Sequence, residues 1–245
     1  MTTILDKLQT VHQRIAAACA ACGRDVAQVT LLPVSKTFGP EAVREAAAAG
    51  EAAFGENYIQ EAVEKMALLD DLALQWHCIG PIQSNKTRLV AAHFDWAHSV
   101  DRLKIAQRLS EQRPAHLTPL QVCLQVNTDG GASKAGVAPG EALALAREVM
   151  QLPGLVLRGI MTIPEPADGF AAQLALHARA KQLFDELRAA GLPLDTLSMG
   201  MTADLEAAIH AGSTMLRVGT AIFGGRGPAG VTGATGAISS APPSA

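Results

Sequence analysis

The stretch VTLLPVSKTFGPEAVREAAAAG, residues 29–50, decides the fold. It opens on a short β-branched and apolar run, Val29–Ser35, of the kind that forms a buried parallel strand. After Pro40 comes a longer amphipathic run, Glu41–Ala49, and Gly50 follows it. Proline near a first turn and glycine just past a last turn mark the two ends of a helix. The stretch therefore predicts one strand and one helix of an α/β sheet.

The same alternation repeats along the chain. We predict eight strands, near Val29–Ser35, Ala52–Gly55, Leu74–Ile79, Trp96–Val100, Leu120–Asn127, Val156–Ile163, Thr196–Met199 and Met215–Val218. The helical segments between them are Glu41–Ala49, Tyr58–Leu69, Ser84–His93, Arg102–Gln112, Pro139–Gln151, Phe170–Ala190 and Ala203–Ala211. Apolar residues at helical spacing before the first strand predict an extra N-terminal helix. Eight strands with this helix pattern fit a TIM-type (β/α)8 barrel better than a doubly wound sheet.

Length and composition indicate one domain followed by a tail. A chain of 245 residues that is 49% hydrophobic can bury one large core, and α/β barrels of this length run as single domains. We expect the barrel to span residues 1–223. Residues 224–245 consist almost entirely of small and polar residues, so we expect them to form a disordered tail.

Charge and hydropathy exclude several classes of partner. A net charge of -3 and 4% aromatic residues provide neither a basic surface nor a stacking platform for nucleic acid. No run approaches the roughly 20 apolar residues that a membrane span needs, and the N-terminus is unlike a signal peptide. We therefore expect a cytoplasmic protein that binds neither nucleic acid nor membranes.

Two motif matches are interpreted as accidental. Cys19 and Cys22 form a C-x-x-C, but they lie late in a helical pattern with no second cysteine pair to complete a zinc site. We expect small buried thiols there. Gly225, Gly227 and Gly230 match a dinucleotide fingerprint, but Pro228 interrupts them and no helix follows.

A lysine stands where a barrel carries its chemistry, at the carboxyl end of a strand. Lys36 directly follows the first predicted strand and its apolar run. Partial burial favours the uncharged amine, which is the form that attacks carbonyl groups. The position therefore permits a Schiff base, although a solvated surface lysine is the alternative interpretation.

The last two predicted strands end in residues suited to a phosphate group. Ser198, Gly200 and Thr202 follow the seventh strand, and Thr202 is a plausible N-cap for the next helix. Arg217, Gly219 and Thr220 end the eighth strand. Phosphates in such barrels are commonly held after strands seven and eight, where glycine lets backbone N–H groups approach the anion. A carbonyl-trapping lysine facing a phosphate cup describes pyridoxal 5'-phosphate (PLP).

Seven separated segments carry a resemblance to a known family. They are PVSKT (Pro33–Thr37), FGENYIQE (Phe54–Glu61), WHCIGPIQSNK (Trp76–Lys86), LQVN (Leu124–Asn127), GIMTI (Gly159–Ile163), LSMGM (Leu197–Met201) and RVGTAIFG (Arg217–Gly224). In this order they closely resemble the pyridoxal phosphate homeostasis protein family, which is related to the barrel domain of alanine racemase. The resemblance implies a fold-type III PLP-binding barrel.

Site residues follow from this resemblance. It implies that Lys36 holds PLP as a Schiff base and that the phosphate contacts are Ser198, Gly219 and Thr220, with Gly200 in the same loop. Arg217 would lie against the pyridine nitrogen or the phosphate, and Asn57 near the ring. Met161 and His77 would line the pocket. Lys134 is interpreted as a solvated loop lysine, with a second aldehyde site as the alternative.

The resemblance favours a PLP carrier that turns over no substrate. Its alternative is a PLP-dependent racemase, which needs an acid or base on each face of the cofactor. In the related racemases one of these groups is the lysine and the other is a tyrosine, whereas the only tyrosine of this sequence is Tyr58. A third hypothesis is an aldolase-like enzyme that uses Lys36 without a cofactor. His77 could act as the second base, but we expect it to be a structural histidine. We expect a monomer or weak dimer, with PLP-dependent apo-enzymes as candidate recipients of the cofactor.

Overall fold

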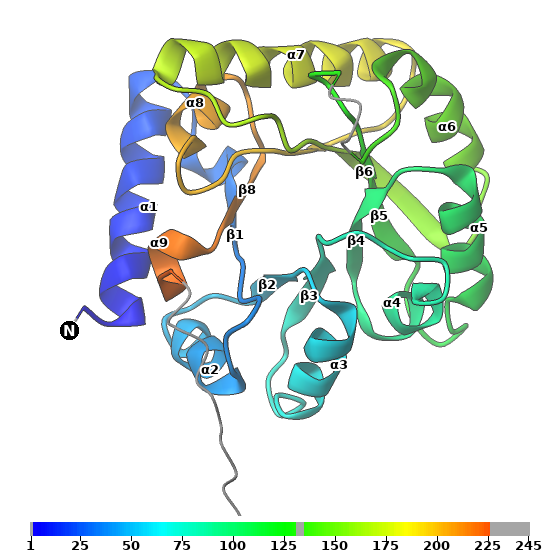
Figure 1. Ribbon diagram of the computed structural model, residues 1–245, viewed down its shortest axis with the longest axis horizontal. Helices are drawn as coiled ribbons and strands as arrows, with labels where there is room; N and C mark the ends of the chain where they lie inside the picture. The colour runs from blue at the N-terminus through cyan, green and yellow to red at the C-terminus, as the bar shows by residue number, and fades with distance from the viewer. Residues whose placement is uncertain (1, 131–134, 226–245) are drawn as a thin grey trace, which may run out of the picture.

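The computed structural model of the protein describes residues 2–130 and 135–225 (Figure 1). Its strands are β1 (Thr30–Pro33), β2 (Ala53–Glu56), β3 (Gln75–Cys78), β4 (Trp96–Val100), β5 (Leu120–Gln125), β6 (Leu155–Met161), β7 (Thr196–Ser198) and β8 (Met215–Val218). They form one parallel sheet in the order β1-β8-β7-β6-β5-β4-β3-β2. A parallel bridge between Val34 and Gly55 joins the two outermost strands, so the sheet closes into the predicted barrel.

Helices surround the barrel (Figure 1). They are α1 (Ile4–Ala21), α2 (Pro40–Ala48), α3 (Ile59–Ala67), α4 (Thr87–His93), α5 (Leu103–Gln112), α6 (Ala142–Val149), α7 (Phe170–Ala189), α8 (Leu205–His210) and α9 (Thr220–Phe223), with 3-10 turns η1 (Val26–Gln28) and η2 (Pro139–Glu141). The predicted N-terminal helix is α1, which begins in a capping box at Thr3 and Asp6 and packs against α2, α8 and α9.

Most differences from the predicted elements lie at their ends. The predicted helix Ala203–Ala211 is the shorter α8, and Thr202 is not its N-cap; Asp204 occupies that position and accepts a hydrogen bond from the Met201 N–H. The short helix α9 directly after β8 was not predicted. Pro139 begins a 3-10 turn before α6 rather than the helix itself.

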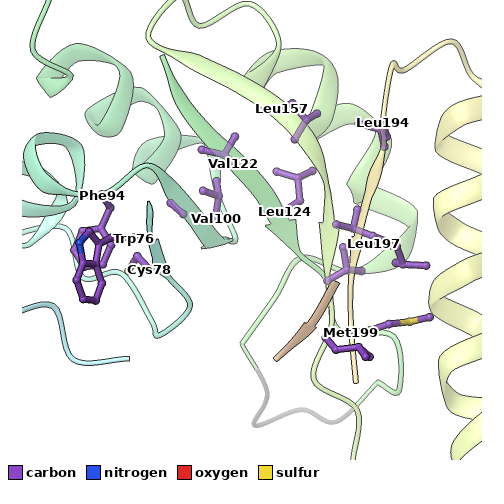
Figure 2. Packing of buried hydrophobic residues seen from close by; sticks show 14 of the residues in the cluster. Trp76, Cys78, Phe94, Val100, Val122, Leu124, Leu157, Leu194, Leu197 and Met199 are labelled. Carbon is purple, nitrogen blue, oxygen red and sulfur yellow. The ribbon is translucent and has the colours of Figure 1, made fainter. Parts of the chain in front are cut away.

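The main hydrophobic core lies between the strands and the surrounding helices (Figure 2). Side chains at alternate positions of a strand point to the same face of a sheet. Val122 and Leu124 of β5 accordingly point to this outer side, beside Leu157 of β6 (Figure 2). Burial of these apolar side chains is the main favourable term in folding, and it fixes which strand residues face inward.

The inside of the barrel is unusually polar. Apolar layers dominate the interiors of most such barrels, and two small clusters of this kind occur here, one containing Leu32 and Met215 and the other Trp96 and Met161. Fully buried polar side chains share this interior: His77, His98, Ser198 and Arg217. These residues alternate along their strands with the outward-facing apolar ones.

The remaining expectations concern membrane spans, metal ligands, the cysteines and the C-terminal tail. No helix in the described ranges is long and apolar enough to cross a membrane. Over the same ranges, no group of three histidine, cysteine or acidic residues could hold a metal ion. The four cysteines are free, and all but the half-buried Cys22 are buried. Lys134 and residues 226–245, which include most of the predicted tail, lie outside the described residues.

Candidate functional site

Five of the nine predicted site residues line one cavity at the carboxyl ends of the strands. The cavity has a volume of about 380 Å³. The predicted residues that line it are Lys36, Asn57, Arg217, Gly219 and Thr220. They come from the ends of β1, β2 and β8, which are neighbours around the barrel, so residues far apart in the sequence meet here.

Threonine hydroxyls form one wall of this cavity. Thr220 donates a hydrogen bond to the hydroxyl oxygen of Thr202 at 3.0 Å, and the backbone N–H of Ala221 lies 3.4 Å from the same oxygen. Thr202 lines the cavity and was not predicted as a site residue, because its place after the seventh strand suggested an N-cap. The loops after β7 and β8 thus meet through hydroxyl groups at the cavity.

Arg217 brings a buried positive charge to the cavity. Its side chain is 4% exposed. It donates hydrogen bonds to the Ser198 hydroxyl at 2.8 Å and to the Thr162 carbonyl at 2.9 Å. Burial lowers the pKa of the guanidinium to about 10, so it stays protonated at neutral pH. No carboxylate in residues 2–130 and 135–225 forms an ion pair with it, and a buried cation without such a partner is costly.

A buried ion pair holds the backbone on which Lys36 stands. Lys65 of α3 donates to Glu56 Oε1 at 2.6 Å and to the carbonyl oxygen of Ser35 at 2.9 Å. The Ser35 hydroxyl donates to the same carboxylate oxygen at 2.6 Å. Burial raises the pKa of Glu56, against the opposing effect of the Lys65 charge. The residue before Lys36 is therefore held by its backbone and its side chain.

The residue after Lys36 is strained. Thr37 has a φ of 67°, a left-handed conformation that is unfavourable for a β-branched residue. Its N–H donates to Glu61 Oε1 at 2.8 Å, and Lys65 lies 3.4 Å from the same oxygen. The chain on both sides of Lys36 is thus fixed by α3. Within the described residues, the Lys36 ammonium itself has neither a hydrogen bond nor an ion pair.

The other four predicted site residues, His77, Met161, Ser198 and Gly200, are not among the residues that line this cavity. His77 and Met161 are almost fully buried inside the barrel, where each contacts the aromatic layer around Trp96. Ser198 is fully buried, and its hydroxyl is engaged by His98 and Arg217. These side chains face the inside of the barrel, and they lie deeper along the strands than the cavity.

Gly200 has a structural role beside the cavity. Its φ is +92°, and a Cβ atom at this position would lie 2.4 Å from the Cβ of Ala208. Only glycine therefore allows the turn after β7 to pack against α8. The residue shapes the loop that carries Thr202 without lining the cavity itself.

The chemistry of the cavity is that of a site for an anion with a carbonyl group. It combines the amine of Lys36, the guanidinium of Arg217 and the hydroxyls of Thr202 and Thr220. None of its described lining residues is acidic. The remaining wall is largely apolar, with Val34, Ile79, Ile163, Met201 and Ala203. A volume of several hundred Å³ with few polar groups is typical of small-molecule sites.

Comparison with known families agrees with this arrangement. The sequence model of the family described as "Alanine racemase, N-terminal domain" matches residues 7–227. The chain belongs to this family. A relative within it, the pyridoxal phosphate homeostasis protein of Pseudomonas aeruginosa, is 62% identical over 226 residues, covering 92% of this chain and 97% of that one. The protein of the same description from Escherichia coli K12 is 49% identical, covering 92% and 98%.

Solved structures of other proteins have the same barrel. PipY of Synechococcus elongatus with PLP bound matches with a TM-score of 0.75 at 40% identity, covering 86% of this chain and all of that one. An alanine racemase from Clostridium difficile 630 matches with a TM-score of 0.72 over 91% of this chain and 58% of its own length. At 16% identity, this second match shows a shared fold alone.

Proposed function

We propose that the protein binds PLP in the cavity between Lys36 and Arg217 and serves PLP homeostasis, holding the cofactor as a Schiff base on Lys36. The observation that carries the proposal is the pair of cationic side chains in one cavity. Neither Lys36 nor Arg217 forms an ion pair with a carboxylate in the described parts of the chain, although the charge of Asp204 acts on Arg217 and opposes the fall in its pKa. PLP would supply what both lack, an aldehyde for the amine and negative charge for the guanidinium.

An unpartnered polar atom tests the fit of PLP to the cavity. The Oδ1 atom of Asn57 is buried and accepts no hydrogen bond from any described residue, although Asn57 lines the cavity. Leaving such an acceptor unsatisfied is costly. PLP has a ring hydroxyl that can donate to an amide oxygen, so the residues present fit this cofactor.

Each lining group has a role in the proposal. Thr202 and Thr220 donate hydroxyl hydrogens to the phosphate, and the close approach of backbone at Gly219 leaves room for it. Arg217 lies against the phosphate or the pyridine nitrogen. The family likeness supports this assignment, because PLP is bound in the PipY structure and the curated relatives carry the homeostasis name.

The proposal is for a carrier that turns over no substrate. PLP supplies electron withdrawal when bound, but racemisation also needs an acid or base on each face. Lys36 is the one residue with an amine, carboxylate, imidazole or phenol among the described lining residues. Tyr58 is half exposed outside the lining, and His77 is buried beneath it. PLP-dependent apo-enzymes are the proposed recipients of the cofactor.

Absorbance spectroscopy tests the proposal. Addition of PLP to the purified protein is expected to give the near-visible band of a Schiff base, and Lys36→Ala is expected to remove it while the circular dichroism spectrum stays unchanged. Lys104→Ala, a lysine of α5 outside the cavity, serves as the matched control. A band of full strength in Lys36→Ala would place the attachment elsewhere, with Lys134 as the next candidate.

A further inference from the structure

A continuous chain of hydrogen bonds crosses the inside of the barrel. Arg217 donates to the Ser198 hydroxyl at 2.8 Å, and Ser198 Oγ lies 3.1 Å from His98 Nδ1. His98 Nε2 lies 2.9 Å from His77 Nδ1, and His77 Nε2 lies 3.1 Å from Gln75 Oε1. We call these five residues the interior relay.

Each hydrogen bond of the interior relay is donated in the same direction, from Arg217 toward Gln75. An amide oxygen can only accept, so His77 Nε2 must carry the hydrogen donated to Gln75. His77 Nδ1 then accepts from His98 Nε2–H, and His98 Nδ1 accepts from the Ser198 hydroxyl. The Ser198 oxygen is left to accept from Arg217, which can only donate. The direction follows from the Gln75 end, because a neutral imidazole has one donor and one acceptor, and the Ser198 oxygen that donates to His98 can still accept from Arg217.

Burial keeps both imidazoles in the neutral form that this pattern requires. Desolvation lowers the pKa of His77 to about 3. It also lowers the pKa of His98 well below the ordinary value, and the proximity of His77 and of the Arg217 charge acts in the same direction. His77 stacks on Trp96 with ring centroids 5.1 Å apart and planes 8° apart, which fixes the plane of its ring.

The two ends of the interior relay lie at opposite openings of the barrel. Arg217 lines the proposed PLP cavity at the carboxyl ends of the strands. Gln75 is the first residue of β3, is exposed, and lines a second cavity of about 520 Å³ together with Gln28, Thr30 and Thr214, at the amino ends. A polar path therefore joins the two openings through an otherwise closed core.

We propose that Ser198, His98, His77 and Gln75 are positioning residues that hold the Arg217 guanidinium in the cavity, and that the interior relay transmits a change at Gln75 to Arg217. Chains of hydrogen bonds polarise one another, which makes such transmission physically sound. The proposal rests on the proposed function for the identity of the ligand, PLP. It replaces a direct phosphate contact of Ser198 by an indirect role through Arg217.

Imidazole ¹⁵N NMR of the protein without PLP tests the direction of the interior relay. Both histidines are expected in the Nε2–H tautomer, unchanged from about pH 6 to about pH 8. Signals are assigned with His77→Gln and His98→Gln. A charged ring or an Nδ1–H tautomer at either residue would overturn the proposed relay, whatever the protein binds.

A pair of matched exposed variants tests transmission. Gln75→Glu and Gln28→Glu each place a carboxylate in the same opening, but only Gln75 belongs to the interior relay. Gln75→Glu is expected to shift the ¹⁵N signals of His98 and of the Arg217 guanidinium, while Gln28→Glu leaves both in place. Equal effects of the two variants, or no shift at His98 in Gln75→Glu, would mean that nothing is transmitted.

PLP titration separates positioning from direct contact. Ser198→Ala and His98→Phe are each expected to weaken PLP binding by about tenfold or more, and the double variant is expected to bind no more weakly than the weaker single variant, because both break one chain. Ser213→Ala, a fully buried serine that donates to the Met199 carbonyl, is the control and keeps wild-type affinity. Loss of affinity in Ser198→Ala alone would make Ser198 a direct ligand. Failure of the wild-type protein to bind PLP would instead contradict the proposed function.

Discussion

The ammonium nitrogen of Lys65 lies 2.9 Å from the carbonyl oxygen of Ser35, the residue immediately before Lys36. Lys65 is thereby a buried lysine that fixes the position of another lysine without touching the cavity. Its charge is balanced by Glu56 at 2.6 Å. Removal of one partner of such a pair leaves a buried charge uncompensated, and this dominates the cost of the change.

Lys65→Met is therefore expected to lower the free energy of unfolding by about 3–5 kcal/mol. Adding Glu56→Gln should recover a large part of this loss, because no unpaired charge remains. Urea unfolding followed by circular dichroism measures both variants. Lys181→Met is the control, since Lys181 pairs with Asp185 on the surface and such pairs contribute about 1 kcal/mol or less. Equal losses for Lys65→Met and Lys181→Met would contradict the account of the buried pair.

The buried histidines predict a loss of stability in mild acid. Folding depresses the pKa of His77 to about 3 by burial, whereas the unfolded chain takes up this proton near pH 6.5. The stability that the neutral ring contributes is thus fully present above about pH 6.5 and is lost as the pH falls toward 3. The slope approaches about 1.4 kcal/mol per pH unit for each such histidine.

The His77→Gln variant isolates this effect. Urea unfolding between about pH 7.5 and pH 5 should show a shallower dependence in His77→Gln than in the wild type, by up to about 1.4 kcal/mol per pH unit. His93→Gln replaces an exposed histidine of α4 and should keep the wild-type slope. Identical slopes in all three proteins would show that His77 takes up protons in the folded state as well.

The hydroxyl groups of Thr202 and Thr220 at the cavity predict a partial loss of PLP affinity when they are removed. Thr202→Val with Thr220→Val should weaken PLP binding by about 1.5–3 kcal/mol for each lost hydrogen bond to the phosphate, without abolishing the Schiff-base band. Fluorescence or absorbance titration measures the dissociation constant. Thr10→Ala on the exposed face of α1 is the control. Unchanged affinity in the double variant would place the phosphate elsewhere in the cavity.

The lining of the cavity predicts that bound PLP leaves the Cα hydrogen of amino acids in place. Only Lys36 among the described lining residues can serve as a base, and a guanidinium beside the pyridine nitrogen would make the ring a weak electron sink. The PLP-loaded protein is incubated with L-alanine in deuterated water, and exchange is followed by proton NMR. Exchange well above that of free PLP, and lost in Lys36→Ala, would favour the racemase alternative.

The strand pattern of the sequence was sufficient for the barrel and for part of the site. Lys36, Asn57 and Arg217 lie at one cavity because the carboxyl ends of parallel strands meet at one rim, whatever their order in the sequence. Alternation along a strand also predicts which side chains face inward. It does not predict how deep each one lies, and His77, Met161 and Ser198 face inward below the cavity.

Two buried residues beside the site, His98 and Lys65, could not be identified from the sequence. His98 was not predicted, because its partners His77 and Ser198 come from other strands and meet it only in the folded barrel. From the sequence alone, Lys65 is indistinguishable from a solvated lysine on a helix. Its burial depends on contacts with Glu56 and Ser35 that form only in the folded protein. Pairings of this kind follow from tertiary packing and not from local pattern.

Attachment of PLP to Lys36 is tested by reduction of the PLP-loaded protein with borohydride, followed by trypsin digestion and mass spectrometry. Trypsin does not cleave after a modified lysine, so attachment at Lys36 gives a single peptide of residues 25–44 that carries the pyridoxyl mass. We expect this peptide in the wild type and its absence when Lys36 is replaced. The pyridoxyl mass on a peptide that contains Lys134, or on none, would contradict it.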